Sequence, residues 1–324
     1  MVEEGSVIDW IAEADPALRW QVERDLQDAP ESTWAPIRAL VETEGAGARL
    51  LALQDPDGQW AGGAFVPHGF TGQRFRDEGQ PWTATTWALT QLREFGLDPN
   101  SARTRETVRL IGENSRWDHA GQPYWTGEVE ECINGRAVAD GAYFGVDVAA
   151  IVARLVREVQ ADGGWNCERG NGSSVSSFAT TINVLEGLLE FERATGGTTE
   201  SRHARRRGEE YLLTRRLFRR ASTGEPADEQ FLTLTYPTRW HYDVLRSLDY
   251  FRSAGRLDRA APDARLEDGI ELIRSKRDQD GRWAMDWKPR GATPFDLDDG
   301  PGQPSRWITL RAMRVLRWWD GPHP

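Results

Sequence analysis

The chain is poor in cysteine and lysine and has no long apolar run. Its 324 residues include two cysteines, Cys132 and Cys167, and two lysines, Lys276 and Lys288. Two cysteines cannot form a disulfide framework, so we expect reduced thiols, one isolated bridge or metal ligands. No window approaches the roughly 18 uncharged apolar residues of a membrane span, and the first ten residues, MVEEGSVIDW, lack a signal-peptide core. These absences predict a soluble, cytoplasmic protein with no integral membrane association.

Positive charge is also scarce relative to negative charge. The formal net charge at pH 7 is -11. Nucleic acids and anionic membranes both favour a basic surface. The composition therefore predicts no nucleic-acid partner and leaves a small-molecule substrate or a peptide as the expected ligand.

A short turn recurs along the sequence. It reads QDPDGQW at 54–60, QADGGW at 160–165 and RDQDGRW at 277–283, with a weaker copy, WDHAGQPYW, at 117–125. A segment with helical periodicity precedes each copy, and a second one follows it. The repeating unit is therefore predicted to be a helical hairpin.

The hairpins predict the fold class. The inner helices are expected to begin near residues 16, 82, 132, 177, 238 and 305. Their outer partners are expected near 6–13, 36–52, 102–114, 146–158, 203–216 and 265–275. Six hairpins that each bury a face against two neighbours predict an all-α, (α/α)6 toroid with one domain over residues 1–324. The stretch 221–230 is expected to be a surface loop within one repeat.

The Q-x-D-G-x-W turns resemble the QW-type repeats of squalene cyclases and of protein prenyltransferase β subunits, which are α/α toroids. The resemblance covers most of the chain and implies an enzyme whose active site lies at one mouth of the barrel. It also implies an architectural role for Trp60, Trp165 and Trp283, which would pack between helices. Fold does not specify activity, so the reaction must be inferred from residues that differ between repeats.

The segment FDLDDG resembles the D-x-D-D pattern of class II terpene cyclases. Asp296, Asp298 and Asp299 match its three carboxylates. The resemblance implies that Asp298 is the general acid and that its neighbours keep it protonated by like-charge coupling. An acid-driven cyclase is one expected activity. The same residues are also typical of a turn rich in Asp, Gly and Pro.

Alignment of the inner helices places polar side chains along one face, which would line the lumen. The expected substrate-binding residues are Arg19, Asn134, Arg136, Asn183, Glu186, Asp243 and Arg311. Asp140 and His241 are expected to act in catalysis from the same face. Charges of this kind would quench carbocations, so they favour a polar or anionic substrate, unless they fill the lumen as ion pairs.

The two cysteines and His241 fall at or just before the starts of three consecutive inner helices. Two thiolates and an imidazole could form an open zinc site, with water, Glu131, Asp147 or Glu168 as fourth ligand. Protein prenyltransferases and lanthipeptide cyclases hold zinc at a comparable mouth. A disulfide and inert thiols are the alternatives.

Three functions follow from these expectations. The first is a cyclase- or prenyltransferase-like enzyme, which is either acid-driven through Asp298 or metal-assisted at Cys132, Cys167 and His241. The second is a toroid enzyme that holds a polar, phosphorylated or peptide substrate with lumen arginines. The third is a non-catalytic toroid that binds a ligand or peptide.

Overall fold

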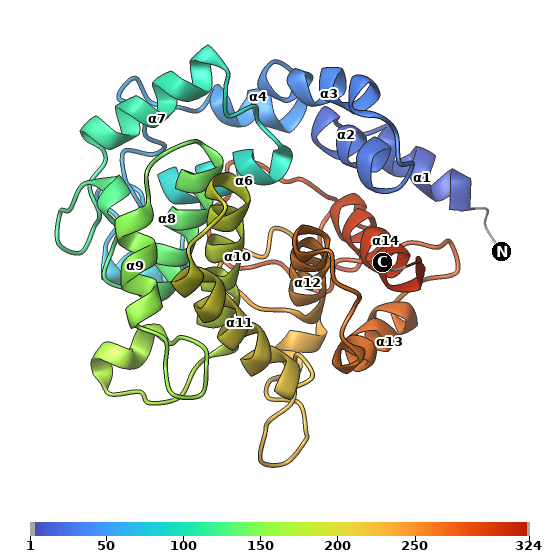
Figure 1. Ribbon diagram of the computed structural model, residues 1–324. Helices are drawn as coiled ribbons and strands as arrows, with labels where there is room; N and C mark the ends of the chain where they lie inside the picture. The colour runs from blue at the N-terminus through green and yellow to red at the C-terminus, as the bar shows by residue number, and fades with distance from the viewer. Residues whose placement is uncertain (1–3, 323–324) are drawn as a thin grey trace. The chain divides into compact units, whose positions relative to one another are not determined.

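The computed structural model describes residues 4–322, and the regular secondary structure of this part of the chain is helical (Figure 1). Four isolated β-bridges occur among these residues, and none of them extends into a strand. The all-α prediction is confirmed. No helix within 4–322 is both long enough and apolar enough to cross a bilayer.

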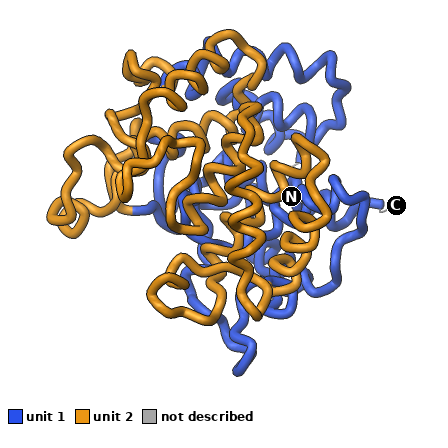
Figure 2. Tube along the Cα trace, turned by 60° about the vertical axis from the view of Figure 1, so that its left-hand side comes forward, with its two compact units in different colours: residues 1–49, 212–289, 295–324 blue, residues 50–211, 290–294 orange. Residues whose placement is uncertain are grey.

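The chain divides into two compact units (Figure 2). Unit 1 comprises residues 1–49, 212–289 and 295–324, and unit 2 comprises residues 50–211 and 290–294. Unit 1 contains α1 (Glu4–Ala12), α2 (Pro16–Asp25), α3 (Glu31–Ala39), most of α4 (Gly45–Leu51), α12 (Val244–Asp258), α13 (Glu267–Ser275) and α14 (Arg306–Asp320). Unit 2 contains α5 (Gly72–Glu78), α6 (Thr85–Phe95), α7 (Ala102–Asn114), α8 (Glu131–Tyr143), α9 (Ala149–Arg157), α10 (Phe178–Thr195) and most of α11 (Thr199–Thr214).

In unit 2, α8 and α10 pack closely because glycines lie at their contact (Figure 1). A Cβ atom on Gly135 would lie 2.4 Å from the carbonyl oxygen of Asn183, and one on Gly187 would lie 2.3 Å from that of Gly135. Both distances are too short for any side chain. The two backbones can therefore touch only because both residues are glycine.

In unit 1, α14 packs against α1, α2 and α12, and α12 also packs against α13. Leu248 of α12 is fully buried, and its Cδ1 lies close to Gly269 of α13. Side-chain caps define where the helices begin: Asp15 accepts from Ala17 N at 2.8 Å and Ser305 accepts from Ile308 N at 3.0 Å. Such caps satisfy backbone donors that the first turn leaves unpaired.

Five of the six inner helices begin within four residues of the predicted position, at residues 16, 85, 131, 178 and 306. The remaining helix, α12, begins at Val244 and not near 238. Arg239 has a left-handed φ of 54°, which interrupts a helix, and Asp243 accepts from Arg246 N at 2.7 Å as the N-cap. Residues 238–243 thus lie in the loop that precedes α12 and not in its first turns.

The three strong copies of the repeat turn share one geometry. Each tryptophan donates its indole Nε1–H to a carbonyl in the last turn of the preceding outer helix, at 2.7–2.8 Å. Each also donates its backbone N–H, at 3.1 Å, to a threonine hydroxyl at the start of the following inner helix. The tryptophan–threonine pairs are Trp60–Thr85, Trp165–Thr181 and Trp283–Thr309. One buried tryptophan in each turn therefore bonds to both the outer helix before it and the inner helix after it.

A second, longer form of the turn occurs twice. In the weak copy, Trp117 N donates to Gln122 O and Gly121 N donates to Trp117 O, each at 3.0 Å. The same pattern recurs at 220–225, where Arg220 N donates to Glu225 O at 2.8 Å and Gly224 N donates to Arg220 O at 2.9 Å. The stretch 221–230 thus includes part of a repeat-type turn, which its sequence does not reveal.

Candidate metal centre

Two thiols and a carboxylate meet in unit 2. The sulfurs of Cys132 and Cys167 and a carboxylate oxygen of Glu130 all lie within 4.8 Å of one another. Cys132 Sγ lies 3.5 Å from Glu130 Oε2. Both cysteines are half-buried free thiols, and Glu130 is exposed. Soft sulfur donors next to a carboxylate form a donor set that suits zinc.

Helix starts position all three groups. Glu130 is the extended N-cap residue of α8, and Cys132 lies in the first turn of that helix. Cys167 begins the 3₁₀ helix η3 (Cys167–Asn171), which follows the repeat turn at Trp165. Thr180, in the first turn of α10, accepts from Cys167 N at 3.3 Å and donates to Cys167 Sγ at 3.5 Å. These contacts place the loop cysteine beside a helix that packs against α8.

The pKa values of the two thiols are shifted in opposite directions. A hydrogen bond from Cys132 lowers the pKa of Cys167 to about 7, although burial acts in the opposite direction. The same hydrogen bond and burial raise the pKa of Cys132 well above its usual value. Thiolate character therefore resides on Cys167. Only the thiolate form is a metal ligand or a nucleophile.

The surroundings of the thiols are acidic. Burial raises the pKa of Glu130, and the nearby charges of Glu128, Glu168 and Glu131 act in the same direction. The carboxylate of Glu131 lies 2.8 Å from Arg169 Nε, and this ion pair compensates one of these charges. A field of this sign attracts a cation and repels an anionic substrate.

His241, the third metal ligand expected from the sequence, lies in unit 1, and its described contacts lie there. Its ring stacks on Trp240 with centroids 3.9 Å apart and meets the edge of Trp287 at 4.9 Å. Its carbonyl oxygen accepts from Arg246 Nη1 at 2.6 Å. The imidazole is therefore held between two indoles. Asp147, one of the expected fourth ligands, is exposed and accepts from Ala149 N at 3.0 Å.

The D-x-D-D carboxylates differ in their environments. Asp298 accepts from Ser305 Oγ at 2.6 Å and from Arg306 N at 3.1 Å, so both of its oxygens bind the start of α14. Burial raises its pKa against these hydrogen bonds. Asp296 is exposed and pairs with Lys288, and Asp299 is also exposed. The described contacts of Asp298 are those of a group that anchors a helix start.

Several expected lumen residues of unit 2 lie together in a buried network. Asp140 pairs with Arg93 at 2.9 Å and accepts from Thr90 Oγ1 at 2.8 Å. Burial raises the pKa of Asp140, and the charges of Arg93 and Arg136 oppose this effect. Arg136 lies over the ring of Trp87 at 5.2 Å. The half-buried Glu186 is close enough to Arg93 to affect its titration.

The two expected asparagines bond to nearby backbone. Asn134 accepts from Glu128 N and donates to Glu128 O, both at 2.8 Å. Asn183 is buried and donates to Ala179 O at 2.7 Å. These bonds hold a loop and a helix turn in place, which is a structural use of polar groups at helix starts.

The buried charges of unit 1 are paired as well. Asp25 is surrounded by four arginines at 2.8–3.6 Å: Arg24, Arg252, Arg256 and Arg314. Asp249 binds Arg314 Nε at 2.8 Å and lies 3.9 Å from the expected ligand Arg311. Burial raises the pKa of Asp243 to about 6 despite its hydrogen bond from Arg246 N. Arg19 is exposed on α2. Most of these charges fill the interior as ion pairs.

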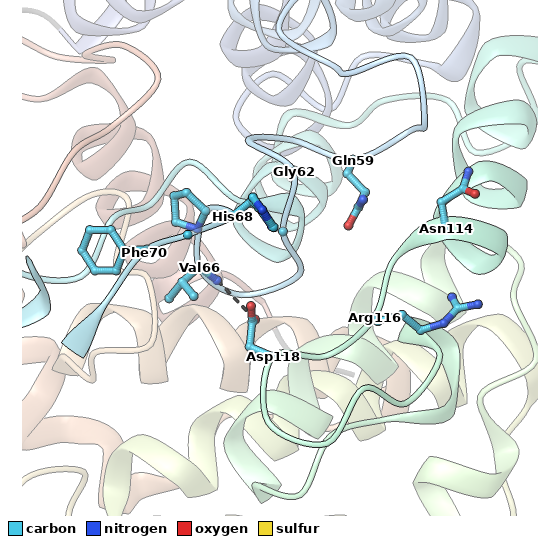
Figure 3. A pocket seen from close by; sticks show the side chains of 11 residues that line it. Gln59, Gly62, Val66, His68, Phe70, Asn114, Arg116 and Asp118 are labelled. Atoms are coloured by element: carbon cyan, nitrogen blue, oxygen red, sulfur yellow. Dashed lines mark hydrogen bonds between the residues drawn. The ribbon is translucent and has the colours of Figure 1, made fainter.

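A separate polar cleft lies in unit 2 and has a volume of about 390 Å³ (Figure 3). Its wall combines the loop 59–70 with the segment 114–118. Figure 3 shows His68 and Gln59 directed toward the same space, and Asp118 beneath the loop accepts from Val66 N at 3.4 Å. Arg116 and Asn114, both exposed, complete the polar lining.

The sequence reasoning missed Glu130 and the residues of this cleft. The sequence did contain a signal for a carboxylate near Cys132, because the run EVEEC places three glutamates, including Glu130, within four residues of this cysteine. The cleft left no such signal. His68 and Arg116 are 48 positions apart in two loops that have no shared motif.

No protein-family model matches the sequence, and the chain matches none of the curated proteins. The resemblance to squalene cyclases and prenyltransferases therefore stays a prediction that depends on the repeat turns alone. The case for function depends on the geometry of the thiol cluster and of the cleft.

Proposed function

We propose that this protein is a zinc-dependent enzyme whose metal is bound by Glu130, Cys132 and Cys167. The proximity of two sulfurs and one carboxylate oxygen carries the proposal. Two zinc–sulfur bonds of about 2.3 Å at a tetrahedral angle place the sulfurs about 3.8 Å apart, which is compatible with their separation of at most 4.8 Å. Three protein ligands leave a coordination position open, as in catalytic zinc sites.

The charges favour a divalent cation over other occupants. With zinc bound, two thiolates and a carboxylate would carry three negative charges, and Glu128 and Glu168 lie near them. Zinc would offset two of these charges and act as a Lewis acid toward a bound polar group. Calcium and magnesium prefer all-oxygen sites, so the thiols select against them.

We propose further that the hairpins close into the α/α toroid. The repetition of one turn geometry at Trp60, Trp165 and Trp283 supports this arrangement, because equivalent turns place successive hairpins in equivalent orientations. A crystal structure tests it, and an open superhelix would contradict it. The acid-driven cyclase is the less favoured reaction because both oxygens of Asp298 bind the start of α14.

Metal analysis tests the zinc site. Untagged protein purified from zinc-supplemented cells should contain one zinc per chain, and Co²⁺ in its place should show sulfur-to-cobalt charge-transfer absorption. Cys132→Ser and Cys167→Ser should abolish binding, and Glu130→Gln should weaken it at least tenfold. The control Glu113→Gln removes an exposed carboxylate that pairs with Arg109 and should bind zinc normally. Zinc content that is equal in wild type and in the cysteine variants would refute the site.

The cleft supports a second candidate function, namely binding of a small polar molecule in unit 2. A volume of about 390 Å³ lies within the range of ligand pockets, and imidazole, guanidinium and amide groups line it. A screen of small carboxylates and phosphates by thermal shift tests this function. A hit should be lost in His68→Ala and retained in His203→Ala, which alters a histidine of α11. A hit that both variants retain, or no hit at all, would count against the cleft.

A further inference from the structure

We propose that Cys132 and Cys167 also form a peroxide-reactive dithiol, which a hydroperoxide converts into an intramolecular disulfide. The inference uses the two sulfurs of the proposed zinc site but does not require zinc to be bound. The two residues are the only cysteines of the chain. Their sulfurs lie within 4.8 Å of each other, and both side chains are half-buried, so a small oxidant can reach them.

The backbone around Cys167 allows the sulfurs to approach. A disulfide needs a separation of about 2.05 Å, so the pair must move by less than about 3 Å. Cys132 is fixed in the first turn of α8. Cys167 begins a segment, 167–175, in which seven of the nine residues are exposed. The short helix η3 within this segment is capped by Gly172, which has a φ of 95°. A loop of this kind can supply the movement while α8 and α10 stay in place.

The two sulfurs are close neighbours. They lie within 4.8 Å of each other, and Thr180 Oγ1 donates a hydrogen bond to Cys167 Sγ at 3.5 Å. The carboxylate of Glu130 lies 3.5 Å from Cys132 Sγ.

The reaction balances with one hydroperoxide. The thiolate of one cysteine attacks the terminal peroxide oxygen, the O–O bond breaks, and sulfenic acid and hydroxide form. The other thiol then attacks the sulfenic sulfur, the S–O bond breaks, and water leaves with the thiol proton taken up. Two thiols are oxidised and one peroxide is reduced to water, or to water and an alcohol. The chain holds no third cysteine, so within one molecule the sulfenic acid has a single thiol partner.

Peptide mapping of the full chain tests the dithiol. Metal-free protein treated with one equivalent of hydrogen peroxide should lose two hydrogen atoms in intact mass. Tryptic digestion without reductant should yield residues 117–136 joined to residues 158–169, and dithiothreitol should separate them. Cys132→Ser should instead give a dimedone adduct at Cys167, with circular dichroism confirming that this variant is folded. Sulfinic or sulfonic acid on unlinked cysteines, a cross-link between chains, or no reaction would overturn the proposal.

The zinc-loaded protein distinguishes the two proposals. If both hold, stoichiometric zinc should slow disulfide formation at least tenfold, because coordinated thiolates are less available to the oxidant, and peroxide should release the metal. A disulfide that forms in protein unable to bind zinc would refute the proposed function and leave the dithiol intact. Zinc binding in a protein that forms no disulfide would refute the dithiol and leave the proposed function intact.

Discussion

In each repeat turn, the hydrogen bond from the tryptophan N–H to the threonine hydroxyl should contribute measurably to the free energy of unfolding. Thr181→Val keeps the shape of the side chain and removes the hydroxyl, which accepts from Trp165 N at 3.1 Å and donates to Trp165 O at 3.4 Å. Trp165 and Thr181 are both fully buried, and water cannot replace the lost acceptor. The perturbation therefore leaves one backbone N–H of Trp165 without a partner inside the protein.

The cost follows from the number of groups left unpaired. A buried donor that loses its partner costs about 1–3 kcal/mol. Thr309→Val removes only the acceptor of Trp283 N–H. Thr85→Val removes the acceptor of Trp60 N–H and also the donor that binds Gly63 O at 2.7 Å. We therefore expect Thr85→Val to lower the free energy of unfolding more than Thr309→Val.

Urea unfolding followed by circular dichroism measures these differences. Thr83→Val is the matched control, because Thr83 is half-buried and its hydroxyl makes no hydrogen bond within residues 4–322. The control should change the free energy of unfolding by less than about 0.5 kcal/mol. If Thr181→Val has no larger effect than Thr83→Val, the threonine does not fasten the turn and the repeat geometry described above is wrong.

Three further variants test other features. Asp25→Asn should lower the free energy of unfolding by about 3–5 kcal/mol, because four arginines lose a buried carboxylate, whereas Asp28→Asn at an exposed pair should cost at most about 1 kcal/mol. Gly187→Ala should force α8 and α10 apart and lower the free energy of unfolding by about 1–3 kcal/mol or more, as overpacking does. Its control, Gly5→Ala, places the new methyl group in open space and should be tolerated. Asp243 has a pKa of about 6 when folded and about 3.9 when unfolded, so its contribution is present below about pH 4 and is lost as the pH rises through 6. Wild type should therefore lose up to about 3 kcal/mol relative to Asp243→Asn over that interval, and parallel pH–stability curves would contradict this.

Local periodicity was sufficient to predict most of the helices, although α5 was not among those predicted. The predicted outer helix 102–114 matches α7 at both ends. The inner helices α2, α6, α8, α10 and α14 begin within four residues of their expected starts. Each of these helices has a cap or an apolar face that its own sequence encodes. The late start of α12 was not predictable in this way, because the positive φ of Arg239 is set by packing around it and not by its residue type.

The thiol cluster was predictable in part for a similar reason. Cys132 and Cys167 lie at the starts of successive repeat units, and helices that pack side by side bring such positions together. Which carboxylate joins them depends on single-residue differences in direction. Glu130 is extended at the N-cap, whereas Glu131, one residue later, is helical and is held by Arg169. Periodicity cannot separate two adjacent glutamates at a helix boundary.

Polar residues near the inner helix starts have a structural role in the repeat turns. Thr85, Thr181 and Thr309 lie near the starts of α6, α10 and α14, and each accepts the backbone N–H of a repeat tryptophan. Asn134 lies near the start of α8 and binds the backbone of Glu128. A polar residue near these helix starts is therefore required by the turn, and its polarity does not indicate a ligand. The cysteines stand apart from this pattern: neither sulfur holds a repeat turn together, and both face a carboxylate.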